Sequence, residues 1–310
     1  DFSFYSFLCL AHGTDWSGVG NVRASAIVSV AVVLLFCLMW LLLSHSFLQI
    51  ATSTGKVCHR EYREKHIRKR GIDEALLGRE FSHFTSSPNY MLNCGLGTFL
   101  MPLCAIAVLW KGSELFVKLD AMFAETAGSV PLLLCVVLCG FASMNFMTAP
   151  SISLEGKSLW LLQSLPIDTW KIYQAKIRMQ LILTGLPMLL CIVCIAAVYP
   201  LYLLQLLMIF LFTASYVWLM ALTGLALGIK MPVLTWTNEI MPIKQGAPVM
   251  ITLFGGFVYM ALLFAGFMLL LGWILGFCGY MSCYVGVNLF ISVLAYMWLR
   301  KKGVAILGSL

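Results

Sequence analysis

The sequence predicts an all-α, polytopic membrane protein, a bundle of transmembrane helices. Hydrophobic residues make up 61% of the 310-residue chain and charged residues only 11%, whereas a soluble domain carries about 25% charged residues. Residues 179–229 and 245–299 contain no Asp, Glu, Lys, Arg or His over 51 and 55 positions. A helix needs about 20 residues to cross the hydrocarbon core, so each stretch holds two spans and a turn.

About seven spans are expected along the chain. They fall at about residues 24–50, 91–110, 129–150, 177–198, 202–229, 248–275 and 277–299. Residues 1–72 form an N-terminal region with an extracellular segment, one span and a basic linker, and residues 73–310 form a six-span core. The chain starts at Asp1 without a charged start and a short apolar core, so we expect a fragment or a processed chain rather than a signal peptide.

The basic residues indicate how the chain lies in the membrane. If the spans alternate in direction, 17 of the 20 Lys and Arg residues fall on one side. The positive-inside rule then places the C-terminus in the cytoplasm and the N-terminus outside. The net charge of +7 is explained by this orientation and by attraction to anionic lipid. Nucleic-acid binding is not expected, because the basic run HREYREKHIRKR contains acids and leads toward a span.

A short amphipathic helix is expected over residues 73–85. Apolar side chains recur at helical spacing, with charged residues such as Glu80 elsewhere around the helix. Gly71 with Asp73 suits the start of a helix. Ser86, Ser87 and Pro88 end the pattern. The element is too short and too charged to span, so it is expected to lie in the interface, either as a plain connector or as a partner contact. Its expected site residues are Leu76, Leu77, Arg79, Glu80, Phe81 and Phe84.

Residues 151–178, which we call the elbow, form a polar block between apolar stretches. They read SISLEGKSLWLLQSLPIDTWKIYQAKIR. Ser151 or Ser153 suits the cap of a short helix, with Glu155 near its positive end. Pro166 ends that segment, and Asp168 caps a second helix that leads into the fourth span. The sequence therefore predicts an ordered elbow, either lying on lipid without a partner or presenting a contact surface.

Catalytic, cofactor and metal sites are not expected. Gly156-Lys157-Ser158 matches the end of a phosphate-binding loop, but that motif needs a glycine at position 151, which is serine, and a preceding strand. Cys191 and Cys194 have CxxC spacing inside a span without a nearby histidine cluster, so they are interpreted as packing residues. His45 has no evident partner, and the spans carry no acid at mid-membrane, so the energy for any transport must come from elsewhere.

Three stretches resemble the permeases of ATP-binding-cassette exporters of the type-2 class, most closely the clostridial-type exporter permeases. They are ALLGREFSHFTSSPNYMLNCGLG (75–97), SLEGKSLWLLQSLPIDTWKIYQAKI (153–177) and TWTNEIMPIKQGAPVMI (235–251). The resemblance covers about residues 73–300. It implies the C-terminal half of a multi-pass permease in the bacterial plasma membrane, with an interfacial helix at 73–85 and a coupling segment at 151–176.

The resemblance also implies a partner and a contact surface. A separate cytoplasmic ATPase subunit would dock on the coupling segment and hydrolyse ATP, so this chain would be no enzyme and would bind no cofactor. Glu155 and Lys157 would make polar contacts, and Leu159, Trp160 and Leu162 would hold the elbow in place. The full implied set is Glu155, Gly156, Lys157, Ser158, Leu159, Trp160, Leu162, Leu165 and Pro166. Either a second permease half or a second copy of the chain would complete the transporter.

Two other functions remain open from the residues. A membrane scaffold or sensor that transports nothing would use the same elbow to recruit a cytoplasmic protein. A stand-alone carrier or membrane enzyme is disfavoured, because the spans lack ionisable residues at mid-membrane. The apolar spans suit lipids, peptides and antibiotics equally well as cargo.

Overall fold

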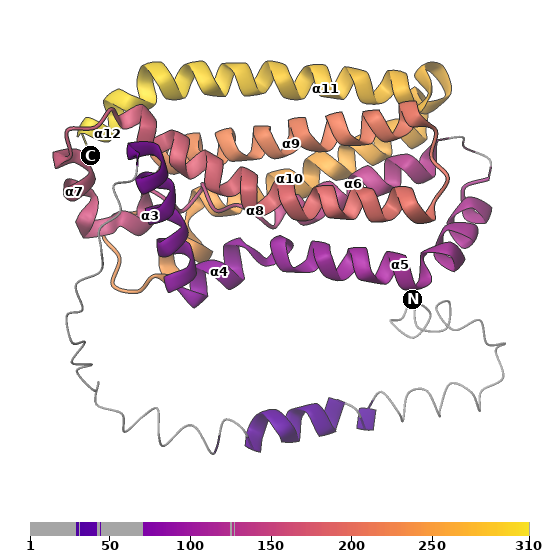
Figure 1. Ribbon diagram of the computed structural model, residues 1–310, viewed down its shortest axis with the longest axis horizontal. Helices are drawn as coiled ribbons and strands as arrows, with labels where there is room; N and C mark the ends of the chain where they lie inside the picture. The colour runs from indigo at the N-terminus through magenta and orange to yellow at the C-terminus, as the bar shows by residue number, and fades with distance from the viewer. Residues whose placement is uncertain are drawn as a thin grey trace. The chain divides into compact units, whose positions relative to one another are not determined.

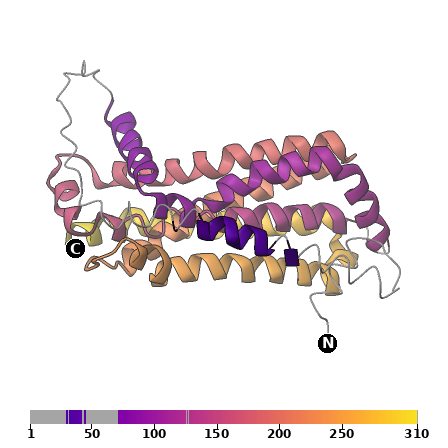
Figure 2. The ribbon, with the colours of Figure 1, turned by 90° about the horizontal axis from the view of Figure 1, so that it is seen from below.

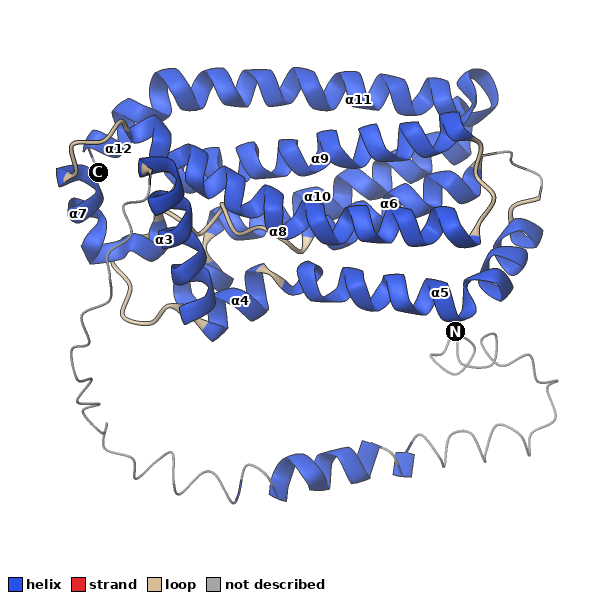
Figure 3. Cartoon of the chain, in the orientation of Figure 1, coloured by secondary structure: helices blue, strands red, loops and turns tan. Residues whose placement is uncertain are grey.

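The computed structural model describes residues 29–30, 32–41, 44, 71–124, 126 and 128–309. The elements from residue 71 onward belong to one compact unit, Lys69–Leu310. Throughout the described residues the regular structure is helical (Figure 3). An apolar helix, Val32–Leu41, lies in the expected first span. Most of the remainder of that span, together with His45 and the basic linker, falls outside the described residues.

The helices of the compact unit are as follows. They are α3 (Ile72–Ser86), α4 (Pro88–Cys94), α5 (Leu96–Met122), α6 (Ser129–Ser143), η1 (Ser153–Ser158), α7 (Leu159–Ser164), α8 (Thr169–Val198), α9 (Leu203–Lys230), η2 (Met241–Gln245), α10 (Ala247–Gly266), η3 (Phe267–Leu271), α11 (Gly272–Trp298), η4 (Leu299–Gly303) and α12 (Val304–Ser309).

Five helical stretches of the described chain are long and apolar enough to cross a membrane. They are Leu96–Met122, Thr169–Val198, Leu203–Lys230, Ala247–Leu269 and Ile274–Gly308. They confirm an all-α, multi-pass membrane bundle. The expected count of seven spans is not confirmed, because α6 has only 15 residues and only part of the first span is described.

The long helices lie side by side along the bundle, with α9 packed against α8, α11, α6 and α10 (Figure 1). The short helices α3, α7 and α12 gather at one end, which we call the elbow end (Figures 1 and 2). Two helices extend beyond their expected spans: α5 continues to Met122 rather than 110, and α8 joins the predicted helix after Asp168 to the span expected from residue 177. Hydropathy marks only the apolar part of a helix, whereas backbone hydrogen bonding continues into polar residues at either end.

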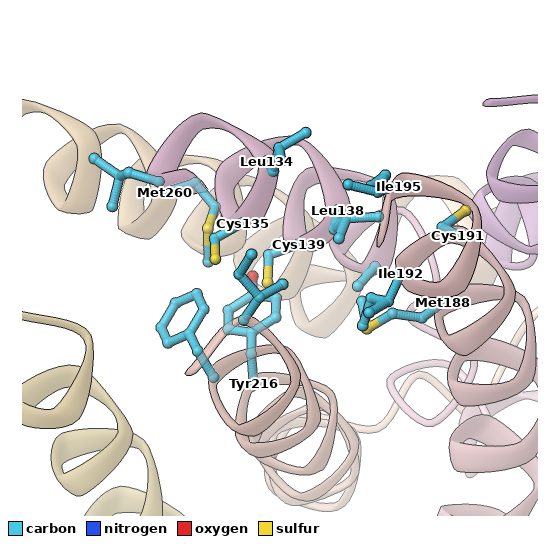
Figure 4. Close-up of a cluster of buried hydrophobic side chains, with 14 of the residues drawn as sticks. Leu134, Cys135, Leu138, Cys139, Met188, Cys191, Ile192, Ile195, Tyr216 and Met260 are labelled. Atoms are coloured by element: carbon cyan, nitrogen blue, oxygen red, sulfur yellow. The ribbon is translucent and has the colours of Figure 1, made fainter. Parts of the chain in front are cut away.

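The centre of the bundle is a packed apolar core in which α6, α8, α9 and α10 meet (Figure 4). Small sulfur-containing side chains such as Cys135 and Cys139 of α6 fill it opposite Tyr216 of α9. Cys191 and Cys194 are buried in the same core, as the packing interpretation predicts, and the Cys191 thiol donates a hydrogen bond to the Met101 carbonyl at 2.9 Å. Small residues allow close helix approach, which favours association where lipid provides no hydrophobic driving force.

The expected third span is wrong over its last third. Helix α6 ends at Ser143, and residues 144–152 form buried turns rather than the end of a helix. Two glycines let other helices approach this segment closely: a Cβ at Gly97 would lie 2.8 Å from Asn145 Oδ1, and one at Gly228 would lie 2.4 Å from the Ala149 carbonyl. The helix can therefore stop early, because side chains and backbone from α5, α8 and α9 pack around the freed chain.

Candidate functional site

Helix α3 lies at the elbow end and presents one buried face. Its N-terminal boundary at Gly71 is as predicted, with the Ala75 amide donating to the Gly71 carbonyl at 2.9 Å. Leu76, Glu80 and Phe84 are buried, and their four-residue spacing places them on one side of the helix. Glu80 was expected away from the apolar face, so its position within the buried face corrects that expectation.

The elbow is ordered, but its first part is built differently from the single short helix expected between its serine cap and Leu165. It forms a short 3₁₀ helix, η1, followed by α7, which ends at Ser164 before Pro166. Gly156 lies inside η1, and its φ of 48° and ψ of −125° interrupt the helical geometry there. Asp168 caps α8 as predicted, because its Oδ1 accepts a hydrogen bond from the Trp170 amide at 3.0 Å.

A loop that follows α9 holds the first part of the elbow. The Trp236 indole Nε1 donates to the Ser153 carbonyl at 2.6 Å, and the Val233 amide donates to the Ser153 hydroxyl at 3.0 Å. Ser153 therefore bonds this loop rather than capping a helix. A Cβ at Gly156 would lie 3.1–3.2 Å from the Trp236 ring, and a positive φ is readily adopted only by glycine. Gly156 thus belongs to a tight structural turn.

Four charged side chains meet where the elbow packs against α3, and we call them the charge cluster. They are Arg79 and Glu80 of α3, Glu155 of η1 and Lys176 of α8. The Lys176 ammonium lies 2.9 Å from Glu80 Oε2 and 3.0 Å from Glu155 Oε1. Arg79 Nη2 donates to Glu155 Oε2 at 2.6 Å, and its Nη1 lies 3.2 Å from Glu80 Oε1. Lys176 is fully buried, and the two carboxylates are nearly so. The charge cluster is electrically balanced and joins three elements.

The pKa values of this cluster follow from its geometry. Burial alone would raise the pKa of Glu155, but the Lys176 charge and the Arg79 guanidinium outweigh burial and lower it from 4.5 to about 2. Burial would lower the pKa of Arg79, yet the hydrogen bond and charge of Glu155 raise it. The Glu155–Arg79 pair is therefore ionised at neutral pH. Removing one partner of such a buried pair leaves an uncompensated charge, which costs about 3–5 kcal/mol.

The C-terminal segment holds the second part of the elbow. Gln163 of α7 donates to the Leu307 carbonyl at 2.7 Å, and the Tyr173 hydroxyl of α8 donates to the Gly303 carbonyl at 2.8 Å. Leu159 and Leu162 are buried with Leu307 in one apolar cluster. The elbow thus rests on α3 and α8, on the loop after α9 and on the chain after α11.

The predicted elbow residues divide into buried and exposed sets. Leu159 and Leu162 point inward, whereas Trp160 is 65% exposed although it was expected to help hold the elbow. Leu161 and Leu165 are also exposed, and Pro166 and Ser158 lie at the surface. Lys157 lies within η1 after Gly156. On α3, Leu77, Arg79 and Phe81 are half-buried. The carboxylate of Glu155, predicted to contact a partner, is bound within the chain.

Lys176 and Trp236 are the site residues that sequence reasoning did not single out. Lys176 was counted only among the basic residues that set orientation. The sequence did indicate that Lys176 is buried, because Ala175 and Ile177 flank this lysine and the apolar span follows closely. Trp236 carried no such signal, because its partner Ser153 lies 83 residues earlier in the chain.

No family model matches this chain, and neither a curated protein nor a solved structure matches it. The likeness to exporter permeases therefore stays a prediction from the quoted motifs.

Proposed function

We propose that this chain is the permease subunit of an ATP-binding-cassette exporter, moved by a separate ATPase subunit in the cytoplasm. One observation carries the proposal: the charge cluster ties η1, the first part of the elbow, directly to Lys176 of α8, a helix long and apolar enough to span the membrane. Movement of the elbow would therefore be transmitted to a membrane helix through ion pairs of 2.6–3.0 Å rather than through a flexible loop.

The charge cluster supports a stiff connection for an electrostatic reason. Opposite charges in a poorly solvated site attract more strongly than at the surface, so separating them is costly. Glu155 contacts both Arg79 of α3 and Lys176 of α8. Movement of η1 would thus displace both helices together. ATP binding in the partner can shift the bundle only if the partner binds its two arrangements with different affinity.

The exposed apolar side chains of α7 support a docking surface on the elbow. Trp160, Leu161 and Leu165 are all exposed. Buried tryptophans often carry much of the binding free energy at protein interfaces. We therefore assign the contact with the ATPase mainly to these three side chains. Glu155 is assigned the transmission of movement, because its carboxylate is already paired within the chain.

The charge distribution supports a cytoplasmic position for the elbow end. Arg300, Lys301 and Lys302 are exposed within η4, and the nearby Leu307 carbonyl accepts a hydrogen bond from Gln163 of α7. Under the positive-inside rule this end faces the cytoplasm of a bacterial cell, where an ATPase subunit has access. The working transporter would pair this permease half with a second half or with a second copy of the chain.

The proposal is tested by measuring ATPase association and ATP turnover. The chain is co-expressed with an ATP-binding-cassette ATPase subunit of the same bacterium, purified in lipid nanodiscs and analysed by pull-down and phosphate release. The double variant Trp160→Ala, Leu161→Ala is expected to weaken association about tenfold or more, as loss of an interface tryptophan does. Trp110→Ala is the matched control, because Trp110 is exposed on α5, outside the elbow.

Two results would contradict the proposal. Association that survives the elbow variant would remove the elbow as the contact. If the rate of ATP hydrolysis by the partner is the same with and without the chain, the result would instead favour a scaffold or sensor. Such a protein recruits a cytoplasmic protein but transports nothing.

A further inference from the structure

A buried polar stripe runs along α8 from the charge cluster into the bundle. Lys176, Gln180 and Thr184 follow one another at four-residue spacing, so they lie on one face of the helix, and all three are buried. This face meets the nonhelical segment after α6. The Lys176 ammonium lies 3.4 Å from the Ser151 carbonyl, and Gln180 Oε1 accepts from the Thr148 amide and hydroxyl at 2.9 and 2.7 Å.

Gln180, in the middle of this stripe, is linked through Asn145 to the N-terminus of α5. Gln180 Nε2 donates to the Asn145 carbonyl at 3.0 Å. The Asn145 side chain in turn uses its Oδ1 to accept from the Thr98 amide at 3.0 Å. Thr98 is the third residue of α5, where backbone amides lack partners within the helix and carry partial positive charge. The Asn145 carboxamide is therefore fixed at the junction of α5, α6 and α8.

Three buried polar atoms, one near the start of α5, one just after α6 and one on α8, have no hydrogen-bond partner in the described chain. They are Asn145 Nδ2, Thr98 Oγ1 and Thr184 Oγ1, and each is buried. Asn145 and Thr184 are each only 1% exposed. The described residues contain one other such atom, Ser292 Oγ on α11. A buried polar group without a hydrogen-bond partner destabilises the folded chain, so proteins usually pair such groups with another polar group or with an internal water.

We propose that the junction of α5, α6 and α8 is a binding site for a neutral oxygen ligand. The oxygen accepts a hydrogen bond from Asn145 Nδ2 and exchanges hydrogen bonds with the hydroxyls of Thr98 and Thr184. A metal cation is disfavoured because the Asn145 amide group donates rather than accepts. An anion is disfavoured because the nearby charge cluster is already balanced. The proposal does not depend on the chain being a permease.

Two sources can supply such an oxygen, and they share one chemistry. One is an internal water, which typically makes about three hydrogen bonds to buried polar groups. The other is the carbonyl or hydroxyl oxygen of a membrane-derived molecule held between the helices. Both predict that the two threonine hydroxyls stabilise the folded chain, whereas hydroxyls without partners would destabilise it.

The sign of a stability change tests the site. Thr98→Val and Thr184→Val keep the side-chain shape and delete only the hydroxyl. Each is expected to lower the midpoint of thermal unfolding in nanodiscs by about 2–4 °C, because the ligand oxygen loses a partner. The matched control is Thr213→Val, since the buried Thr213 hydroxyl bonds only to carbonyls of its own helix, at 2.8 Å from Ile209 O and 3.1 Å from Phe210 O. It is expected to change the midpoint little.

Two lipid preparations distinguish the sources. Water predicts the same loss in nanodiscs of pure synthetic phosphatidylcholine and of native membrane extract, with a compact density beside Asn145 by cryo-electron microscopy. A membrane-derived molecule predicts the loss only in native extract, with an elongated density. An unchanged or raised midpoint for both threonine variants in both preparations overturns the proposal.

Discussion

At the scale of single residues, the carboxylate of Glu155 shows how burial and pairing compete. Burial penalises its charged form, yet Lys176 and Arg79 together hold its pKa at about 2. Attraction by the two cations outweighs the effect of burial because both cations lie within 3.0 Å of the carboxylate oxygens. This residue therefore makes the stability of the elbow sensitive to acid.

We expect the chain to lose stability in acid through Glu155. Its folded-state pKa of about 2 lies below the ordinary 4.5, so its stabilisation is complete above about pH 4.5 and is lost as the pH falls toward 2. Glu155→Gln should be less stable at neutral pH and should lack this part of the acid dependence. Thermal unfolding between about pH 7 and pH 3 measures both effects. Glu74→Gln, at an exposed acid of α3, serves as the control.

Gly156 provides a second prediction about a single residue. Gly156→Ala should destabilise the chain by about 1–3 kcal/mol, because φ is positive there and the new Cβ would press on the Trp236 ring. Gly185→Ala is the matched control inside α8, where a Cβ meets nothing within 4 Å. That change should be neutral or stabilising by up to about 1 kcal/mol. Equal effects of the two changes on unfolding would contradict the assigned turn.

At the scale of elements, α3 and α8 are joined by two ion pairs of very different burial. Lys176 and Glu80 form a buried pair at 2.9 Å, whereas Lys171 and Asp73 form a largely exposed pair at 3.8 Å. Exposed pairs contribute about 0.2–1 kcal/mol or less. The same two helices therefore provide a buried pair and an exposed pair for direct comparison.

A double-mutant cycle should separate these pairs. Lys176→Met alone should destabilise the chain by about 3–5 kcal/mol, because it leaves buried carboxylates uncompensated. Adding Glu80→Gln should recover part of that loss, with a coupling free energy well above about 1 kcal/mol. The cycle of Lys171→Met with Asp73→Asn should give coupling below about 1 kcal/mol. Similar coupling in both cycles, measured by unfolding in nanodiscs, would show that the charge cluster does not join the two helices.

At the scale of the whole molecule, the orientation of the bundle decides whether any cytoplasmic protein can reach the elbow. The exposed elbow residue Trp160 and the exposed α5 residue Glu114 are expected on opposite sides of the membrane. This expectation comes from the basic residues and the alternation of spans.

Cysteine labelling tests this orientation. Trp160→Cys should react with a membrane-impermeant maleimide in inside-out vesicles and should be protected in right-side-out vesicles. Glu114→Cys should show the reverse pattern, and the unmodified chain corrects for its own cysteines. Labelling of Trp160→Cys from the outside would remove the proposed coupling to a cytoplasmic ATPase.

Composition and local chemistry were enough to predict the class of protein and several boundaries. Long uncharged runs predict membrane helices, and the caps at Gly71 and Asp168 were predicted because a cap depends on residues within one turn. The early end of α6 and the inward position of Glu80 could not be predicted in this way. Both depend on partners far along the chain: Gln180 bonds the chain freed after α6, and Lys176 pairs with Glu80 across 96 positions. Only the packing of distant helices brings such groups within hydrogen-bonding distance.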